Sequence, residues 1–275
     1  DIDAVRGALR ECAFAATAIG GDHFVKLAPM LAEVDRAAPL NVVLCENRDG
    51  AGDVLQAALP RTRTPIGCVG AEVGRMVPVP TAELRAEDPL LVLAEPYVPL
   101  IVDGARWLGP RPALQGVRFV DDLAPHHARK LYTHNGGHFL LACLAREKGM
   151  ELLAEAADDP ELVARLRGFW DETGAAICAA YGLDPAEQHA FEDDLLERFR
   201  NRALGDTVER VARDPLRKLR SDDRLVGAAL LCLARGIEPV ATCDAIRTAV
   251  RVHGIAGADL DWPSEIAGRV GAVVQ

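Results

Sequence analysis

A stretch of ten residues, RKLYTHNGGH (129–138), gathers a lysine, an asparagine and two histidines within a largely apolar chain. On a helix, Lys130 and His134 share a face because they stand four residues apart, and the same spacing joins His134 to His138. Three interpretations fit this pattern: a solvent-exposed polar helix face, a metal site, and a lysine acid/base with polar neighbours.

In the third interpretation, Lys130 exchanges a proton with a substrate hydroxyl, since burial lowers the pKa of a lysine toward neutrality. Asn135 and His138 would then hold the oxygen that changes between hydroxyl and carbonyl. Gly136 and Gly137 would each weaken a helix by about 1 kcal/mol relative to alanine. We therefore expect either a helix break there or glycines that leave room for a substrate beside Asn135.

The metal interpretation would use His134 and His138, with His126 and His127 nearby in the sequence. No acidic residue or further ligand stands at a recognisable metal-site spacing. We therefore predict no metal site, and a metal-dependent hydrolase is the weakest alternative. In the lysine interpretation His134 has no role.

The composition of the chain limits its class. A chain of 275 residues can form two domains, and its 49% hydrophobic and 26% charged residues are typical of a globular protein. The net charge of −10 argues against a nucleic-acid partner, and no apolar run is long enough for a transmembrane helix, so we predict no membrane partner. Seven cysteines without CxxC spacing predict reduced core thiols in a cytoplasmic protein.

The first part of the chain alternates strand-like and helix-like segments, which is typical of a parallel sheet. Strands are predicted at 11–20, 40–47, 66–79 and 89–103. Prolines and glycines in the last two runs favour edge strands, bulges or bends over a continuous ladder. From about residue 122, helical periodicity dominates. We therefore predict an α/β fold followed by an all-α region: the remainder of a Rossmann-like parallel-sheet domain in residues 1–118, and a mostly helical catalytic and substrate domain in residues 119–275.

Ligands of such a sheet lie beyond the carboxyl ends of its strands. Thr17 and Ala18 end the first predicted strand, and their small side chains let a flat cofactor approach the backbone. Asn47 ends the second and could bond a ligand oxygen, although a turn or helix cap is the alternative. We predict that Thr17, Ala18 and Asn47 bind the cofactor.

A dinucleotide site also needs a glycine-rich first turn with GxGxxG spacing. No such motif occurs in the 275 residues, and Asp53 follows Gly50-Ala51-Gly52 where it would repel a phosphate. We therefore expect a complete site to need a segment preceding Asp1, and we expect the 275 residues alone to bind nicotinamide cofactor weakly or not at all.

Further segments accompany the lysine motif along nearly the whole chain. They are ATAIG (16–20), PLNVVLCEN (39–47), VGRMVP (73–78), RFRN (198–201) and VERVARDPLRKLRSDDRL (208–225). Together with Lys130, Asn135 and His138, which match a Lys-x4-Asn-x2-His signature, they resemble the polyol-specific long-chain dehydrogenase family. The last segment is closer to the mannitol-1-phosphate branch of that family than to the free-polyol branch.

The resemblance implies roles for matching positions. Lys130 would be the catalytic acid/base, Asn135 and His138 would act with it, and Asn47 would also hold the substrate. The family commonly has an aspartate at the place of Gly74, so one group of the substrate pocket is replaced.

Arg210 and Lys218 match basic residues that line the substrate pocket of the family, where a substrate phosphate would find partners. From their spacing alone, they would instead form a solvated basic helix face.

The resemblance implies an NAD-dependent oxidoreductase that interconverts a sugar alcohol, or its phosphate, and the corresponding keto sugar. The expected reaction is of the mannitol 1-phosphate/fructose 6-phosphate type, with a lysine acid/base and no catalytic metal, in a monomer or homodimer. The alternative is a truncated, catalytically inactive relic that serves as a structural or interaction module.

Overall fold

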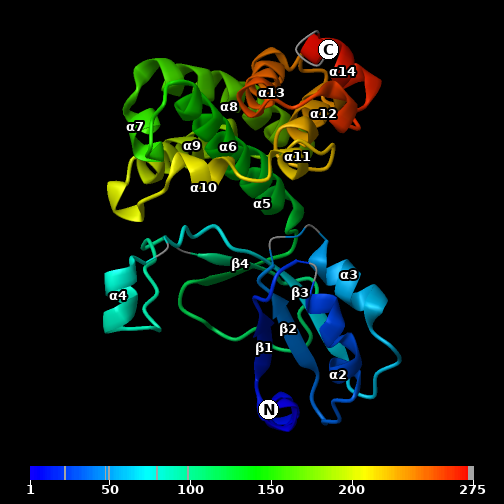
Figure 1. Cartoon of the computed structure of the whole chain (residues 1–275). Helices are drawn as coiled ribbons and strands as arrows, with labels where there is room; N and C mark the ends of the chain where they lie inside the picture. The colour runs from blue at the N-terminus through cyan, green and yellow to red at the C-terminus, as the bar shows by residue number, and fades with distance from the viewer. Residues whose placement is uncertain (22, 47, 49, 79, 98, 272–275) are drawn as a thin grey trace. The chain divides into compact units, whose positions relative to one another are not determined.

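The computed structural model describes residues 1–21, 23–46, 48, 50–78, 80–97 and 99–271. The chain divides into two compact units. The α/β unit comprises Asp1–Arg75 and Pro96–His127, and the helical unit comprises Met76–Glu95 and Ala128–Gln275. The helices and strands of both units are drawn in Figure 1. Each unit has its own hydrophobic core.

The α/β unit is built on a five-stranded sheet in the order β1-β2-β3-β4-β5. The strands are β1 (Phe14–Thr17), β2 (Leu40–Leu44), β3 (Ile66–Glu72), β4 (Leu100–Asp103) and β5 (Val117–Val120). The first three pair in parallel, β4 is antiparallel to β3, and β5 is parallel to β4. Every residue of β2 is buried, as expected of an inner parallel strand that is covered on both faces. The predicted Rossmann-like sheet is confirmed.

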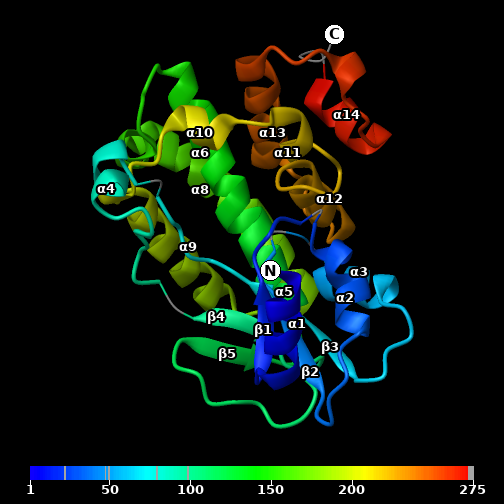
Figure 2. The same cartoon turned by 60° about the horizontal axis from the view of Figure 1, so that its bottom comes forward.

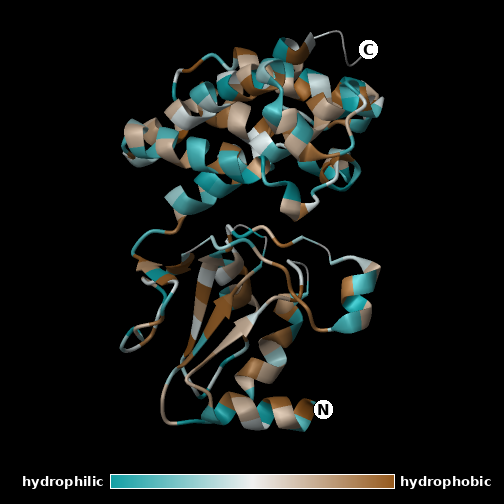
Figure 3. Ribbon diagram, turned by 90° about the vertical axis from the view of Figure 1, so that its left-hand side faces the viewer, coloured by the Kyte–Doolittle hydropathy of each residue, from teal (hydrophilic) through white to brown (hydrophobic). Residues whose placement is uncertain are grey.

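Helices cover one face of this sheet. They are α1 (Ile2–Glu11), the 3₁₀ turn η1 (Phe24–Leu27), α2 (Ala28–Ala32) and α3 (Ala51–Ala58). Because side chains alternate along a strand, Val42 and Leu44 pack under these helices, whereas Val43 packs in a smaller cluster on the other face. The strands accordingly range from brown to white in the hydropathy colouring of Figure 3.

Some boundaries differ from the expected ones. Helix α1 precedes the first strand and was not predicted, and neither was β5. Within the strand-like run at 89–103, for which an interrupted ladder was expected, only β4 pairs among the described residues. Prolines at 89, 96 and 99 lack the N–H group that a ladder requires, which explains the shortening.

The helical unit contains α4 and, after residue 127, a run of helices, so the predicted all-α region is confirmed. Its elements are α4 (Ala82–Glu87), the end of α5 (Ala124–Ala128), the π-helix η2 (Arg129–Asn135), α6 (Gly136–Glu147), α7 (Leu153–Asp158), α8 (Pro160–Tyr181), α9 (Pro185–Phe199), η3 (Arg202–Leu204), α10 (Val208–Ala212), α11 (Pro215–Lys218), α12 (Val226–Ala234), α13 (Val240–His253), η4 (Gly257–Asp259) and α14 (Ser264–Val270).

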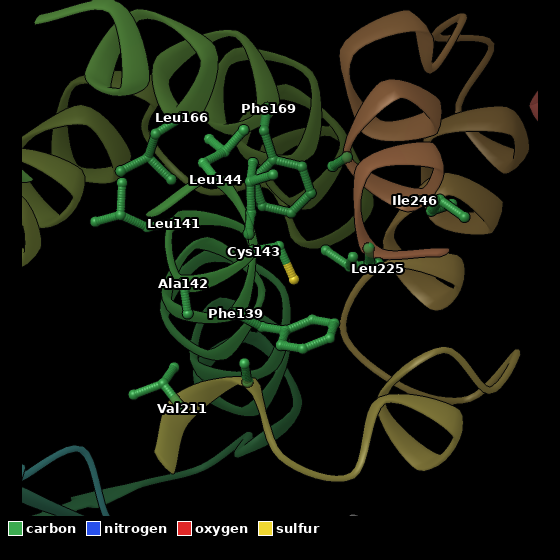
Figure 4. Close-up of a cluster of buried hydrophobic side chains, with 14 of the residues drawn as sticks. Phe139, Leu141, Ala142, Cys143, Leu144, Leu166, Phe169, Val211, Leu225 and Ile246 are labelled. Atoms are coloured by element: carbon green, nitrogen blue, oxygen red, sulfur yellow. The ribbon is translucent and has the colours of Figure 1, made fainter. Parts of the chain in front are cut away.

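Helix α6 forms the centre of this unit. It contacts α7, α8, α10 and α13 (Figure 2). Residues 139–145 of α6 are all buried, which fits a helix that is apolar on every side and surrounded by other helices. Phe139 and Leu144 of α6 lie among side chains of α8, α10, α13 and the loop before α12 in Figure 4. The lysine motif therefore enters directly into the core of the unit.

All seven cysteines are unpaired, and five of them are buried, in agreement with the expected core thiols. Within the described ranges, no helix is both long and apolar enough to cross a membrane.

Candidate active site

Lys130 lies in a π-helix rather than in an α-helix. In η2 the N–H of Gly136 donates to the carbonyl of Leu131, five residues earlier. Such wide turns are rare in proteins, but those that occur often lie at functional sites. The helix therefore does not break at the paired glycines; it changes its pitch just before them.

The expectation that Gly136 and Gly137 leave room for a substrate is wrong. A Cβ atom on Gly137 would lie 2.5 Å from Nε1 of Trp170, and one on Gly136 would lie 2.9 Å from the ring of Phe169. Both rings belong to α8. The indole of Trp170 also donates a 2.9 Å hydrogen bond to the carbonyl of Thr133 in the π-helix. The glycines thus allow α8 to pack against the π-helix and hold it.

The amine of Lys130 meets the ring of His134, to which the sequence assigned no role. Nζ of Lys130 is 3.0 Å from Nδ1 and 3.2 Å from Nε2 of His134, and His134 is buried. Burial, and then the charge of Lys130, lowers the pKa of His134 well below its ordinary value. A neutral imidazole can accept a hydrogen bond from the lysine and so fix the direction of its amine.

His138 is held from two sides. Its Nε2 lies 2.7 Å from Oδ2 of Asp206, and its ring stacks on Phe199 with the centroids 5.0 Å apart. Asp206 also accepts a hydrogen bond from Arg210. Burial, followed by the charges of Lys130 and Arg210, lowers the pKa of His138 well below its ordinary value. Asn135 ends the π-helix between the two histidines and is partly exposed.

Lys218 does not belong to a solvated helix face, since only 7% of it is exposed. Its Nζ donates a 2.6 Å hydrogen bond to the carbonyl of Val211 and lies 4.9 Å from the ring centroid of Phe139. Burial lowers the pKa of Lys218 to about 8, and the nearby charge of Arg224 adds to this effect. A basic group with these contacts is built into the core around α6.

Arg224 is a further buried cation that was not singled out from the sequence. Its Nε is 2.7 Å from Oδ1 of Asp223, and burial lowers its pKa. The charges of Arg210, Lys218 and Arg224 all act on His138. Besides the carboxylate of Asp206, this histidine is thus influenced by cations of the helical unit.

In the α/β unit, the carboxyl end of β1 presents a buried hydroxyl. Oγ1 of Thr17 has no hydrogen-bond partner among the described residues, and the next residue, Ala18, is exposed. The carboxylate of Glu46 accepts hydrogen bonds from the backbone N–H groups of Ile19 (3.1 Å) and Gly20 (2.8 Å). Glu46 therefore fixes the backbone beyond the strand. Asn47, predicted to bind both cofactor and substrate, lies outside the described residues.

Position 74 is filled by a neighbouring ring. A Cβ atom on Gly74 would lie 2.8 Å from Cε1 of Tyr97, so an aspartate there would require the tyrosine to move. The two residues line a hollow of about 420 Å³ in the α/β unit. Glycine in place of the family aspartate therefore leaves space that the ring of Tyr97 occupies.

His127, which lies just before the motif, contacts a carboxylate. Nδ1 of His127 lies 2.9 Å from a carboxylate oxygen of Glu72 in the α/β unit. Across the part of the chain that the structure describes, no group of three or more histidine, cysteine or acidic side chains could hold a metal ion.

Comparison with known proteins identifies the family. The family model "Mannitol dehydrogenase Rossmann domain" matches residues 1–116, and "Mannitol dehydrogenase C-terminal domain" matches residues 122–251. The chain belongs to the mannitol dehydrogenase family. Its residues at 130, 135 and 138 thus lie in the C-terminal domain of that family, and residues 17, 18 and 47 lie in the Rossmann domain.

Curated relatives and solved structures agree with this assignment. Mannitol-1-phosphate 5-dehydrogenase of Brevibacillus brevis is 37% identical over 252 residues, which are 86% of this chain and 64% of that enzyme. The Bacillus subtilis protein of the same name is 34% identical over 256 residues, 88% of this chain and 66% of that protein. The chain thus spans a little under two thirds of the length of these relatives.

Two solved structures share the fold. Pseudomonas fluorescens mannitol 2-dehydrogenase, in a ternary complex with NAD and D-mannitol, matches with a TM-score of 0.68 at 20% identity, covering 92% of this chain and 62% of that one. A substrate-free D-sorbitol dehydrogenase matches with a TM-score of 0.71 at 18% identity, covering 92% and 63%.

Proposed function

We propose that the protein carrying this chain is an NAD-dependent dehydrogenase that interconverts a sugar-alcohol phosphate and the corresponding keto-sugar phosphate, of the mannitol 1-phosphate/fructose 6-phosphate type. The observation that carries this proposal is the contact of Lys130 with His134 beside His138, within a family whose curated relatives bear that enzyme name. A cytoplasmic location and a monomeric or homodimeric state accompany it as predictions.

Lys130 would be the acid/base of this reaction. In the direction of oxidation, its uncharged amine takes the proton of the hydroxyl whose carbon is oxidised, and in the reverse direction its ammonium returns the proton. His134 orients the amine, since the two groups are in hydrogen-bond contact. Asn135 would donate to the reacting oxygen, and Nδ1 of His138 would contact a neighbouring substrate hydroxyl.

The electrostatics of the helical unit favour an anionic substrate. Arg210, Lys218 and Arg224 act on His138 together with Lys130, and Asp206 is the carboxylate in contact with that ring. A phosphate carries up to two negative charges near neutral pH and binds arginine and lysine strongly. These cations therefore support a phosphorylated polyol over a free one.

The α/β unit fits a nucleotide cofactor at the end of β1. Thr17 offers a buried hydroxyl that has no partner among the described residues, and the exposed methyl group of Ala18 leaves the backbone accessible. These two residues would hold the cofactor, with Asn47 as a further candidate. Bound NAD would supply the hydride acceptor.

Turnover measured by NADH absorbance tests the proposal in the natural protein that contains these residues. Lys130→Met should lower kcat by about 10²–10⁴-fold, with an unchanged circular dichroism spectrum. Lys148→Met, which removes a lysine paired with Asp159 and Glu161 at the surface, is the control and should keep its activity. Retained turnover in Lys130→Met would remove this lysine from the mechanism.

The substrate is tested with a matched pair of compounds, mannitol 1-phosphate and mannitol. The phosphorylated polyol should have the higher kcat/KM, and Arg210→Met should reduce that preference. Equal efficiency with both compounds would contradict the phosphate assignment.

A further inference from the structure

Asp206 is a buried acid between the predicted catalytic histidine and a predicted substrate arginine, and no motif in the sequence marks it. It is 9% exposed. Its backbone is fixed, because its carbonyl accepts a 2.9 Å hydrogen bond from the N–H of Leu153. The next residue, Thr207, caps α10 through the N–H of Arg210 and forms a β-bridge with Leu152. The carboxylate is therefore presented from a rigid point.

The two oxygens of Asp206 have different partners. Oδ2 lies 2.7 Å from Nε2 of His138, and Oδ1 accepts a hydrogen bond from Arg210. An ionised carboxylate has only acceptor sites, so the imidazole nitrogen that faces it must carry a proton. This contact assigns the proton of His138 to Nε2.

The opposite nitrogen, Nδ1, is then the one that can accept a hydrogen. Among the described residues, two rings pack against it: Phe199, which stacks on it, and His134, whose ring centroid is 6.1 Å away. The charged groups that act on it, besides Asp206, are Lys130, Arg210, Lys218 and Arg224. All four are cations, so they oppose a second proton on the ring. His138 thus has a lone pair at Nδ1.

We propose that Asp206 is a positioning residue: it fixes His138 as the Nε2–H tautomer, and with the same carboxylate it holds Arg210 beside that histidine. The consequence for catalysis rests on the proposed function, because a lone pair at Nδ1 accepts the hydrogen of a substrate hydroxyl other than the one that Lys130 deprotonates. The assignment of the tautomer itself depends only on the contacts of Asp206.

Asp206→Asn distinguishes a role in fixing the tautomer from a role in filling space, because asparagine has nearly the shape of aspartate but carries two N–H donors. Arg210 has only donors, so it requires the amide oxygen. The amide NH₂ would then face Nε2 of His138 and force that nitrogen to become the acceptor. Asp206→Asn should therefore move the proton of His138 from Nε2 to Nδ1, as a buried acid beside a histidine does when it is replaced by its amide.

The tautomer can be measured directly in the protein labelled with ¹⁵N-histidine. Long-range ¹H–¹⁵N correlation spectra distinguish the two ring nitrogens, and the signals of His138 are those lost in His138→Gln. The wild type should show the Nε2–H form, Asp206→Asn the Nδ1–H form, and Arg210→Met the Nε2–H form. Asp244→Asn, which alters a partly exposed aspartate paired with Arg165, should leave the wild-type pattern.

A wild-type His138 protonated at Nδ1 would overturn the proposal, and so would an Asp206→Asn protein that keeps the Nε2–H form or an Arg210→Met protein that loses it. If Asp206→Asn does not fold, the wild-type spectrum decides. In turnover, Asp206→Asn should lower kcat by roughly 10–100-fold, the size expected for a group that orients a functional histidine. A wild type that does not oxidise polyol phosphates would defeat the proposed function but leave the spectra to test Asp206.

Discussion

The two units present their functional groups in different ways. At the end of β1, the α/β unit offers the hydroxyl of Thr17 and a backbone that Glu46 holds in place. The helical unit instead buries charged side chains beside its core, and Asp206 and Lys218 are both less than 10% exposed. A site made of backbone and small residues tolerates substitution at little cost in stability. A site made of buried charges requires that every partner be in place.

The largest effect should come from a buried ion pair of the helical unit. Arg198 and Glu95 are 10% and 4% exposed, and Glu95 also accepts a hydrogen bond from the N–H of Met76. Glu95→Ala leaves the arginine buried without this partner, which should lower the free energy of unfolding by about 3–5 kcal/mol. Urea denaturation followed by circular dichroism measures the free energy of unfolding of the variant and the wild type.

The matched control is Asp158→Ala, which breaks the exposed pair with Arg202, 50% and 59% exposed. Its effect should stay below about 1 kcal/mol. Both pairs lie in the helical unit, so equal losses in the two variants would mean that burial does not decide the cost of breaking an ion pair there.

A medium effect is expected where the π-helix packs on α8. Gly137→Ala places a methyl group against Trp170 and disturbs the hydrogen bond from its indole to Thr133. Overpacking of this kind costs about 1–3 kcal/mol, and it should also lower kcat by displacing Lys130. The thermal midpoint and turnover are the measurements.

Gly168→Ala provides the comparison within α8. A Cβ atom there would meet only Ala241, at 3.5 Å. Helical alanine is favoured over glycine, so this variant should gain roughly 0.5–1 kcal/mol. A stabilised Gly137→Ala protein would show that the glycine is not required by the ring.

A smaller, pH-dependent effect is expected at Glu192, which is 1% exposed and accepts a hydrogen bond from Gln188. Burial raises its pKa from 4.5 to about 6. The folded protein therefore binds its proton more tightly than the unfolded chain, and stability falls as the pH rises from about 4.5 to 6. Relative to Glu192→Gln, the wild type should lose up to ~2 kcal/mol across this range.

Gln188 also donates to Oγ1 of Thr133, so this titration takes place in the network that supports the π-helix. Glu187→Gln, an exposed position on the same helix, is the control. If the difference between wild type and Glu192→Gln does not change with pH, the carboxyl group does not titrate in this way.

The smallest effect on stability should be in the α/β unit. Thr17→Val removes a buried hydroxyl that has no partner among the described residues. Stability should stay constant or rise by up to about 1 kcal/mol, whereas NAD affinity of the natural protein should fall. Calorimetry and NADH fluorescence titration report the two quantities.

Thr64→Val is the matched variant in the same unit. The hydroxyl of Thr64 donates to the carbonyl of Val34 and accepts from the N–H of Arg36. Its removal should cost about 1–3 kcal/mol. A large loss in Thr17→Val, comparable to that of Thr64→Val, would show that the end of β1 is not preorganised for a ligand.

The sequence predicts those elements that are marked by a pattern among neighbouring residues. The buried run of β2 and the helical periodicity after residue 122 are patterns of neighbouring residues, and both predictions are confirmed. Strand β5 escaped prediction because it has only four residues and follows a loop rich in glycine and proline. The limits of β4 depend on pairing with β3 and β5, which no local pattern contains.

In the candidate site, too, residues of a local motif were predicted and a residue distant in sequence was not. Lys130, Asn135 and His138 are found from one short motif, but Asp206 meets His138 across 68 residues of sequence. A lone aspartate between two family-like segments, RFRN and VERVARDPLRKLRSDDRL, was the only available signal. The role of the paired glycines was misjudged for a similar reason, since the rings they accommodate belong to α8.

The π-helix changes the direction in which the side chains of the motif point around the helix axis. Each residue of an α-helix turns the chain by about 100°, and the wide turn of η2 places its residues in a different phase from those of α6. Deletion of one residue between Lys130 and His134 would let the segment wind as an α-helix. The lysine and the imidazole would then stand three residues apart, a spacing that still places both on one face of an α-helix. The five-residue hydrogen bond of Gly136 would give way to a four-residue one, so the wide turn itself, and not the pairing of lysine with imidazole, depends on the extra residue.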